Sequence, residues 1–258
     1  MNILISNDDG VNGEGLKVLA SALAKNNKVF VLAPDRNRSA VSNYFSLFAK
    51  SLTIKKISEN FYSCSGTPVD CIITAYTSNL FGEKIDVVVS GINRGENVGR
   101  DIVYSGTCAA ARQAVFYGIP ALAVSVFAED SSGEGTNDGK YPVLYDAMAD
   151  FVSKNLSELI KLCDLGLNPS FVNINGDSLA EYKGFKFTTS LCKKDYSDKV
   201  SLEKNGDELK TVFEGGNGLP MNHEPSDYDI CKRGFIAISR VLADPSALSI
   251  EKEVKLSL

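Results

Sequence analysis

The chain opens with the stretch NILISNDDG (residues 2–10), which decides the fold we expect. Its apolar run stops at two adjacent carboxylates and a glycine, as a buried strand does when it ends at a ligand site. Ligands of open α/β sheets gather outside the carboxyl ends of the strands. Burying one carboxylate is costly, and two side by side repel each other. A bound cation is the simplest physical reason for placing both there.

Length and charge limit the classes of protein to consider. The 258 residues suffice for one large α/β domain, or for a core domain with a smaller one. A net charge of -5 argues against a nucleic acid duplex or an anionic membrane as partner, because both require a basic surface. We see no stretch long enough to span a bilayer and no basic region ahead of the first apolar run, so we expect a cytoplasmic protein.

Cysteine and histidine do not indicate a zinc site. The six cysteines form no C-x-x-C pair, and the one histidine, His223, is interpreted as a surface or hinge residue. Reduced thiols fit a cytoplasmic protein, and we expect most of the cysteines to be small buried residues.

Strand and helix signals alternate along the first half of the chain. Periodic apolar positions predict helices at residues 16–24, 69–80 and 107–117, the second capped by Thr67 with Pro68 at its first position. Continuous apolar runs predict strands at residues 3–5, 28–33, 85–90 and 120–126. This order predicts an α/β fold, with a Rossmann-like, mostly parallel sheet and helices on both faces.

The second half begins with a polar loop and then changes character. We expect the loop at residues 129–140, a helix at 141–162 and a strand at 171–175. Short alternating strands follow at 185–187, 210–213 and 234–238, separated by glycine turns at Asn205-Gly206 and at 215–218. We therefore predict a catalytic core over residues 1–183 and a smaller β-rich extension with a C-terminal arm over residues 184–258.

Three loops meet at the carboxyl edge of the predicted sheet, and each carries oxygen ligands. Gly10 lets the chain turn, so that Asp8 and Asp9 can converge on one ion. The hydroxyl of Ser39 and the amide oxygen of Asn93 complete an oxygen-only donor set, which prefers a hard ion such as Mg²⁺, Mn²⁺ or Ca²⁺.

An anion site is predicted beside these ligands. Residues 104–107 open an alanine-rich helix, whose free backbone amides and two hydroxyls would attract a negative charge. A cation on one side and helix amides on the other would suit a phosphate group.

Each motif has a simpler interpretation when it is taken alone. Residues 8–10 could form only a turn before the next helix. The other polar residues could be helix caps or turn residues: Ser39, Asn93, Asn97, Ser105 and Thr107. We favour a shared site because all of these motifs fall at one edge of the sheet.

Five motifs in order resemble the SurE family, the stationary-phase survival nucleotidases. They lie at residues 3–10, 33–39, 65–68, 89–97 and 104–107. The resemblance is specific through about residue 126, and a late segment at 226–236 is also similar to the family.

The resemblance implies an enzyme, a 5′-nucleotidase of the phosphoric monoester hydrolases. Its substrates would be nucleoside 5′- and 3′-monophosphates, and in some members short polyphosphate. It also implies one divalent cation per subunit, Mg²⁺ or Mn²⁺, and a homodimer or homotetramer formed by exchange of C-terminal elements.

Carried over by motif, the resemblance assigns two sets of site residues. The metal ligands would be Asp8, Asp9, Ser39 and Asn93. The phosphate would be held by Asn43, Asn97, Ser105, Gly106 and Thr107. Our hypothesis is that a metal-bound water attacks the phosphate at the helix N-terminus, while Asp8 or Asp9 orients or deprotonates that water. The alternative is phosphorylation of one aspartate, but no Asp-x-Asp-x-Thr motif is present, so we favour water.

Two other classes of protein remain as alternatives. A deacetylase with paired aspartates would use histidines and zinc, and His223 is far from Asp8 in the sequence. A dinucleotide-binding or phospho-receiver module is the second alternative. The first strand–helix turn is not Gly-x-Gly-x-x-Gly, and Asn93 follows the strand after which a receiver would need its phosphoacceptor aspartate.

Overall fold

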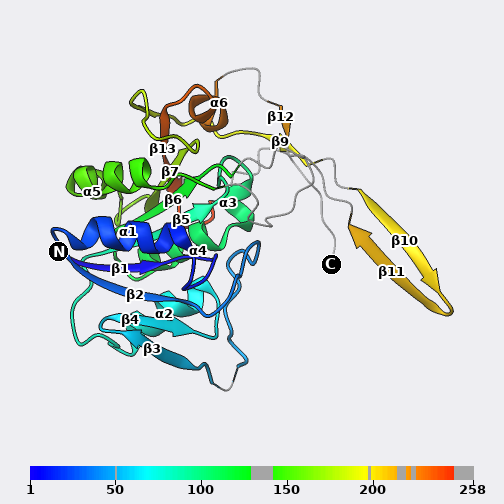
Figure 1. The fold of residues 1–258 in the computed structure, drawn as a ribbon, viewed down its shortest axis with the longest axis horizontal. Helices are drawn as coiled ribbons and strands as arrows, with labels where there is room; N and C mark the ends of the chain where they lie inside the picture. The colour runs from blue at the N-terminus through cyan, green and yellow to red at the C-terminus, as the bar shows by residue number, and fades with distance from the viewer. Residues whose placement is uncertain (50, 129–141, 197–198, 214–218, 222–224, 247–258) are drawn as a thin grey trace, which may run out of the picture.

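The computed structural model describes residues 1–49, 51–128, 142–196, 199–213, 219–221 and 225–246. Within these residues the centre of the molecule is a nine-stranded sheet, in the order β3-β4-β2-β1-β5-β6-β7-β13-β8 (Figure 1). Its strands are β1 (Asn2–Ser6), β2 (Lys28–Pro34), β3 (Ile54–Ser58), β4 (Phe61–Cys64), β5 (Val87–Arg94), β6 (Ala121–Val126), β7 (Ser170–Gly176), β8 (Phe185–Phe187) and β13 (Ile236–Leu242).

The sheet is parallel in its interior and mixed at its edges. Strands β4, β2, β1, β5, β6 and β7 run in one direction, so their carboxyl ends meet at the same edge. Strand β3 is antiparallel to β4, and β13 is antiparallel to β7. The predicted mostly parallel α/β sheet is thus confirmed.

Helices cover both faces of this sheet. Helices α1 (Glu14–Ala24) and α5 (Asp146–Ile160) pack in one core with Ile3, Ile5 and Val89. Helices α2 (Pro68–Thr77) and α4 (Gly106–Phe116) pack in a second core with Leu4 and Val88. Because side chains of a strand alternate between its faces, neighbouring residues of β1 supply both cores.

Helix α2 begins as its sequence predicts. The Thr67 hydroxyl accepts the N–H of Asp70 at 3.3 Å, and the Asp70 carboxylate accepts the N–H of Thr67 at 2.8 Å. Pro68 stands at the first helical position, where its missing N–H would have no intrahelical partner.

The C-terminal region differs from its prediction in one respect. Strands β8 and β13 were expected in a separate β-rich extension, but both pair within the main sheet. Both segments form strands, as predicted, and they join the main sheet because β13 pairs with β7, a segment far away in the chain. The division of the chain into two domains near residue 183 stays a prediction.

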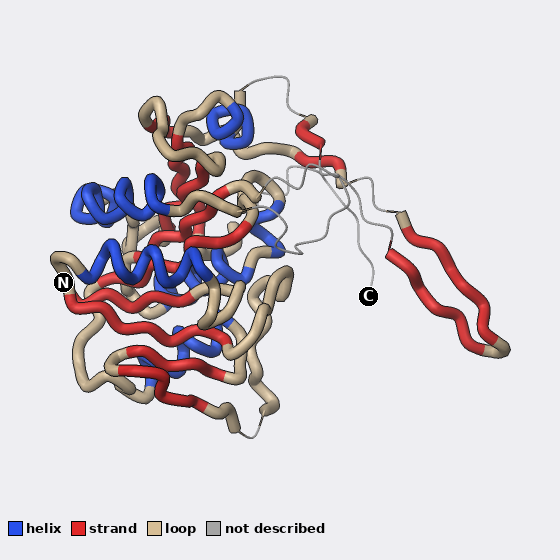
Figure 2. The backbone as a smooth tube through the Cα atoms, viewed as in Figure 1, coloured by secondary structure: helices blue, strands red, loops and turns tan. Residues whose placement is uncertain are grey.

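A smaller β-rich part does exist. Strands β10 (Val200–Asn205) and β11 (Glu208–Phe213) form an antiparallel hairpin that stands away from the body of the molecule (Figure 2). Gly206 adopts a φ of 64° at its turn, as the Asn205-Gly206 pair predicts. The remaining short elements are β9 (Lys194–Asp195), β12 (Leu219–Pro220), α3 (Asp101–Tyr104) and α6 (Asp227–Lys232).

Several predictions fall outside the described residues: the loop at 129–140, the turn at 215–218 and His223. Each of the six cysteines is free, and five are buried, which fits their interpretation as small core residues. Among the described residues, no helix combines the length and the apolar character needed to cross a membrane.

Gly15 should be indispensable for the contact between α1 and β5. A Cβ at this position would overlap the carbonyl oxygen of Ile92, so Gly15→Ala should destabilise the fold despite the better helix propensity of alanine. We expect a loss of about 2 kcal/mol or more in the free energy of unfolding, measured with urea. The control Ser21→Ala, on the exposed face of α1, should change it by less than about 0.5 kcal/mol.

Candidate active site

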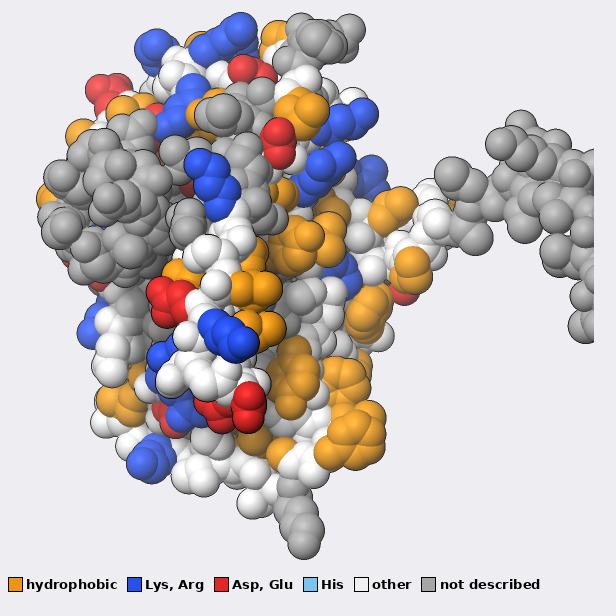
Figure 3. Space-filling view, turned by 90° about the vertical axis from the view of Figure 1, so that its right-hand side faces the viewer, with side chains coloured by type: hydrophobic (Ala, Val, Ile, Leu, Met, Phe, Trp, Pro, Cys, Tyr) orange, Lys and Arg blue, Asp and Glu red, His pale blue; other side chains and the backbone are white. Residues whose placement is uncertain are grey.

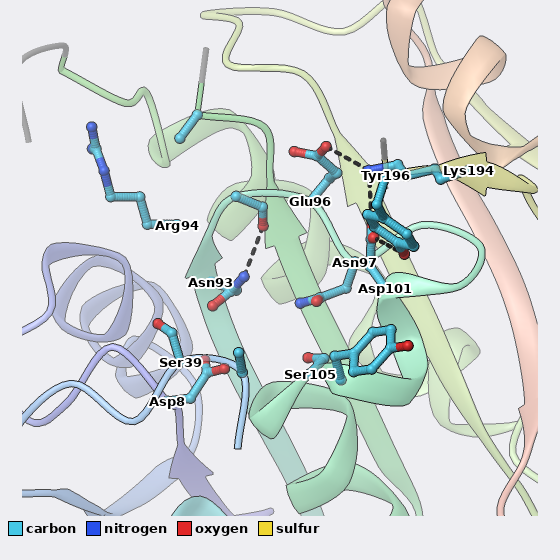
Figure 4. Close-up of a pocket in the computed structure, with 14 residues that line it drawn as sticks. Asp8, Ser39, Asn93, Arg94, Glu96, Asn97, Asp101, Ser105, Lys194 and Tyr196 are labelled. Atoms are coloured by element: carbon cyan, nitrogen blue, oxygen red, sulfur yellow. Dashed lines mark hydrogen bonds and ion pairs between the residues drawn. The ribbon is translucent and has the colours of Figure 1, made fainter. Parts of the chain in front are cut away.

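A pocket of about 390 Å³ opens at the carboxyl edge of the parallel strands (Figure 4). Of the nine residues predicted to form a site, five line it: Asp8, Ser39, Asn93, Asn97 and Ser105. Figure 3 looks onto this side of the molecule, where hydrophobic side chains lie beside acidic and basic ones.

Asp8 lies directly after β1, is 3% exposed, and is packed against the start of α4. The hydroxyl of Thr107 donates a hydrogen bond to its Oδ1 at 2.5 Å. Burial raises the pKa of Asp8, while the Thr107 hydroxyl and the backbone amides of Thr107 and Gly106 act to lower it. A Cβ on Gly106 would come within 2.9 Å of the Asp8 Cβ, so glycine permits this close approach.

Asp9 is half-buried and turns toward the end of β5. Its Oδ2 accepts the backbone N–H of Arg94 at 2.9 Å. Burial, and then the adjacent charge of Asp8, raise the pKa of Asp9 to about 7. Asp9 therefore lies beside the pocket lining, and the two carboxylates are only partly compensated by the protein.

The sequence predicted Asn93 in a loop, but the structure places it on a strand. Strand β5 continues to Arg94, with a shift of register between Ser90 and Asn93. The side-chain Nδ2 of Asn93 donates to the carbonyl of Gly95 at 2.8 Å. This hydrogen bond leaves the amide oxygen directed to the pocket, on the same side as Asp8 and Ser39 (Figure 4).

Ser39 is exposed in the loop that follows β2. Its N–H donates to the side chain of Asn37 at 2.7 Å, and the preceding N–H of Arg38 donates to the carbonyl of Asp8 at 2.7 Å. The loop is thereby attached to the end of β1, which places the serine at the mouth of the pocket.

Asn97 is buried, and hydrogen bonds fix both its backbone and its side chain. Its backbone N–H donates to Asn175, and its carbonyl accepts the side-chain amide of Asn173 at 2.9 Å. Its own Nδ2 donates to the hydroxyl of Ser125 at 2.9 Å. The sequence analysis missed Asn173 and Asn175 as supports, although their spacing of two residues on β7 places them on one face.

The other predicted phosphate-binding residues differ in their position relative to the pocket. Ser105 is the N-cap of α4, and its hydroxyl accepts the N–H of Cys108 at 3.0 Å. Gly106 and Thr107 lie next to Asp8 but do not line the pocket themselves. Asn43 is exposed and accepts a hydrogen bond from Arg112 at 2.8 Å, so the structure does not bring it into the pocket.

The far wall of the pocket comes from residues that the sequence analysis did not identify. Lys194 of β9 forms ion pairs with Glu96 at 2.8 Å and with Asp101 at 2.6 Å. The phenol of Tyr196 donates to Asp101 at 2.7 Å, and Tyr104 completes this wall. No local motif marks Lys194 or Tyr196, because they reach the site only through the fold.

The donor atoms around Asp8 fit a hard cation. Within the described part of the chain, no three His, Cys, Asp or Glu side chains cluster as a metal site, so any ion would need the Ser39 and Asn93 oxygens as well. The pKa values of the adjacent Asp8 and Asp9 are raised, so the protein compensates their negative charge only in part. A bound cation would stabilise both carboxylates.

Comparison with known proteins gives consistent matches. Residues 3–198 match the family model described as "Survival protein SurE". A protein of Treponema pallidum named "5'-nucleotidase SurE" is 43% identical over 70% of this chain and 93% of its own length. A protein of Geobacter sulfurreducens with the same name is 37% identical, over 100% of this chain and 95% of its own. The crystal structure of a SurE protein from Aquifex aeolicus superimposes with a TM-score of 0.78 at 28% identity, covering 95% of each chain.

Replacing Asp9 should stabilise the metal-free protein. Because the pKa of Asp9 is raised in the folded state, the contribution of this carboxyl group to folding stability is largest below about pH 4 and is lost as the pH rises through about 7. In EDTA, Asp9→Asn should flatten this dependence and raise the free energy of unfolding at pH 8 by about 2 kcal/mol. Urea unfolding between pH 4 and 8 measures the effect.

The control is Asp150→Asn, which removes an exposed carboxylate of α5 and should leave the pH dependence as in the wild type. A wild-type slope in Asp9→Asn would contradict the raised pKa of this half-buried carboxyl group.

Proposed function

The chain belongs to the SurE family and is a 5′-nucleotidase, and on that premise we propose that it hydrolyses nucleoside monophosphates with one bound Mg²⁺ or Mn²⁺ per subunit. The observation that supports this best is the meeting of Asp8, Ser39 and Asn93 in a pocket beside the N-terminus of α4. We extend the proposal to nucleoside 3′-monophosphates and short polyphosphate on the family resemblance alone.

The metal would be held by Asp8, Asp9, Ser39 and Asn93. When bound, such a cation supplies positive charge that offsets the carboxylates and the charge building up on the phosphate during transfer. The oxygen-only donor set and the raised pKa values of the two aspartates support these ligands.

Two hydrogen-bond donors would hold the phosphate. A side-chain amide has two N–H groups, and the described contacts use one of those of Asn97, toward Ser125. The hydroxyl of Ser105 accepts from Cys108 and keeps its own proton for donation. Both residues line the pocket, so they can fix a phosphoryl group for in-line attack. Gly106 and Thr107 would act through Asp8, and the role of Asn43, whose side chain accepts a hydrogen bond from Arg112, is proposed on the family resemblance alone.

Asp8 is better placed than Asp9 to handle the attacking water. Asp8 lines the pocket, whereas the Oδ2 of Asp9 accepts the Arg94 N–H. In the proposed reaction the water gives a proton to the Asp8 carboxylate as its oxygen bonds to phosphorus. The bond from phosphorus to the nucleoside oxygen then breaks, and that oxygen takes up the proton that Asp8 received, which returns Asp8 to its carboxylate form.

We further propose that the chain works as a homodimer or homotetramer in the cytoplasm. The hairpin β10–β11 leaves Leu202, Leu209 and Phe213 more than 60% exposed. An isolated two-stranded hairpin is marginally stable in water, so a second copy of the chain is a natural partner for it. Six free thiols fit a reducing compartment.

The oligomer proposal is tested by light scattering after size exclusion. The wild type should elute as a dimer or tetramer, and a Leu202→Ser/Phe213→Ser variant should shift to a smaller species. A monomeric wild type, or an unchanged assembly in the variant, would speak against the hairpin as the contact.

Activity is tested by phosphate release from AMP and GMP with Mn²⁺ or Mg²⁺. EDTA should abolish release, and Asp8→Asn should reduce it by at least about 100-fold while circular dichroism stays native. Asp150→Asn is the matched control and should keep wild-type turnover, because its carboxylate is exposed and remote from the pocket.

Full activity in Asp8→Asn would refute the role of this carboxylate. No phosphate release from either nucleotide with either cation would refute the proposed reaction and favour a binding function.

A further inference from the structure

Lys194 is a buried cation with no part in the proposed reaction. Its side chain is only 5% exposed, yet it lines the pocket. Lysine is almost never buried without a partner, and here the ammonium lies between the carboxylates of Glu96 and Asp101, at 2.8 and 2.6 Å. Figure 4 shows this group on the opposite side of the pocket from Asp8 and Ser39.

The charges around the pocket explain why a cation is needed there. Three carboxylates line it, those of Asp8, Glu96 and Asp101, against two cations, Arg94 and Lys194. A phosphate monoester is close to a dianion at neutral pH and would be repelled by unpaired carboxylates. Lys194 pairs with both of the carboxylates that are remote from the candidate metal ligands and offsets one of their two negative charges.

The loop that carries Asn97 does not depend on Lys194 for its position. Asp227 is 1% exposed, and its two oxygens accept the backbone N–H groups of Gly99 at 2.8 Å and Cys192 at 2.7 Å. The carbonyl of Asn97 is held by Asn173. These contacts fix the same loop and the same C-terminal segment without any charge from Lys194.

We propose that Lys194 is a positioning residue that lets the pocket accept a phosphate dianion, by pairing with Glu96 and Asp101 and lowering their net negative charge rather than by binding the phosphate itself. The inference rests on the proposed function, because the ligand is the phosphate of a nucleoside monophosphate. Its particular consequence is that Lys194 should become dispensable once the two carboxylates are replaced by neutral groups.

The experiment compares Lys194→Met with the triple variant Glu96→Gln/Asp101→Asn/Lys194→Met. In Lys194→Met two carboxylates face the pocket unpaired, so KM for AMP should rise about tenfold or more, with a smaller change in kcat. The triple variant should return KM to within about threefold of the wild type. Lys194→Arg should also stay close to the wild type, since it keeps the charge.

The control is Lys204→Met, an exposed lysine of the hairpin, which should leave both constants unchanged. A triple variant as weak as Lys194→Met would overturn the proposal, because the lysine would then contact the phosphate or hold the wall directly. An unchanged KM in Lys194→Met would overturn it too. Should Lys194→Met fail to fold, the triple variant alone decides, since it leaves no unpaired carboxylate.

A second measurement separates this inference from the proposed function. Calorimetry with inorganic phosphate and Mg²⁺ should rank the same variants in the same order, with about a tenfold weaker Kd only for Lys194→Met. If the wild type released no phosphate from AMP, the proposed function would fail, and the calorimetric ranking would still support or refute the role of Lys194.

Discussion

The contact between the Asp8 carboxylate and the first turn of α4 is the constraint on which the site depends. A charged group that is 3% exposed needs compensation, and the Thr107 hydroxyl with the amides of Gly106 and Thr107 supplies part of it. Because Gly106 has no side chain, β1 and α4 approach closely enough for this contact. The strand order then brings the ends of β2 and β5 to either side of β1, and with them Ser39 and Asn93.

The parts of the fold that could be predicted from the sequence are those with a strong local signal. Residues 3–5 and 121–126 are buried on both faces, so their apolar runs are continuous, and Leu16, Leu19 and Leu23 mark one stripe of α1. The sequence analysis did not predict strands β3 and β4. Strand β3 is short, exposed and rich in lysine, so it has no apolar pattern typical of a strand. The place of β13 beside β7 depends on a pairing between distant segments, such as Ala237 with Asn175, which no local pattern encodes.

The same distinction holds for the site. Asp8, Ser39, Asn97 and Ser105 follow or precede regular elements, and Asn93 lies near the end of β5, so the parallel topology alone brings them to one edge. Asn43 lies in a long irregular loop, where neither periodicity nor capping indicates the direction of a side chain. Lys194 and Tyr196 lie far along the chain from Glu96 and Asp101, and the sign of their role is their contact with these two carboxylates in the folded structure.

The separation of Lys194 from its partners also gives the site an order of assembly. Lys194 follows Asp101 by 93 residues, and the ribosome adds about 5 to 20 residues per second. Asn97 and the start of α4 therefore leave the ribosome about 5 to 20 s before the lysine that pairs with Glu96 and Asp101. During that interval the growing chain contains both carboxylates without this cation. The nascent core is thus kept from acquiring a finished pocket until the C-terminal segment has been made.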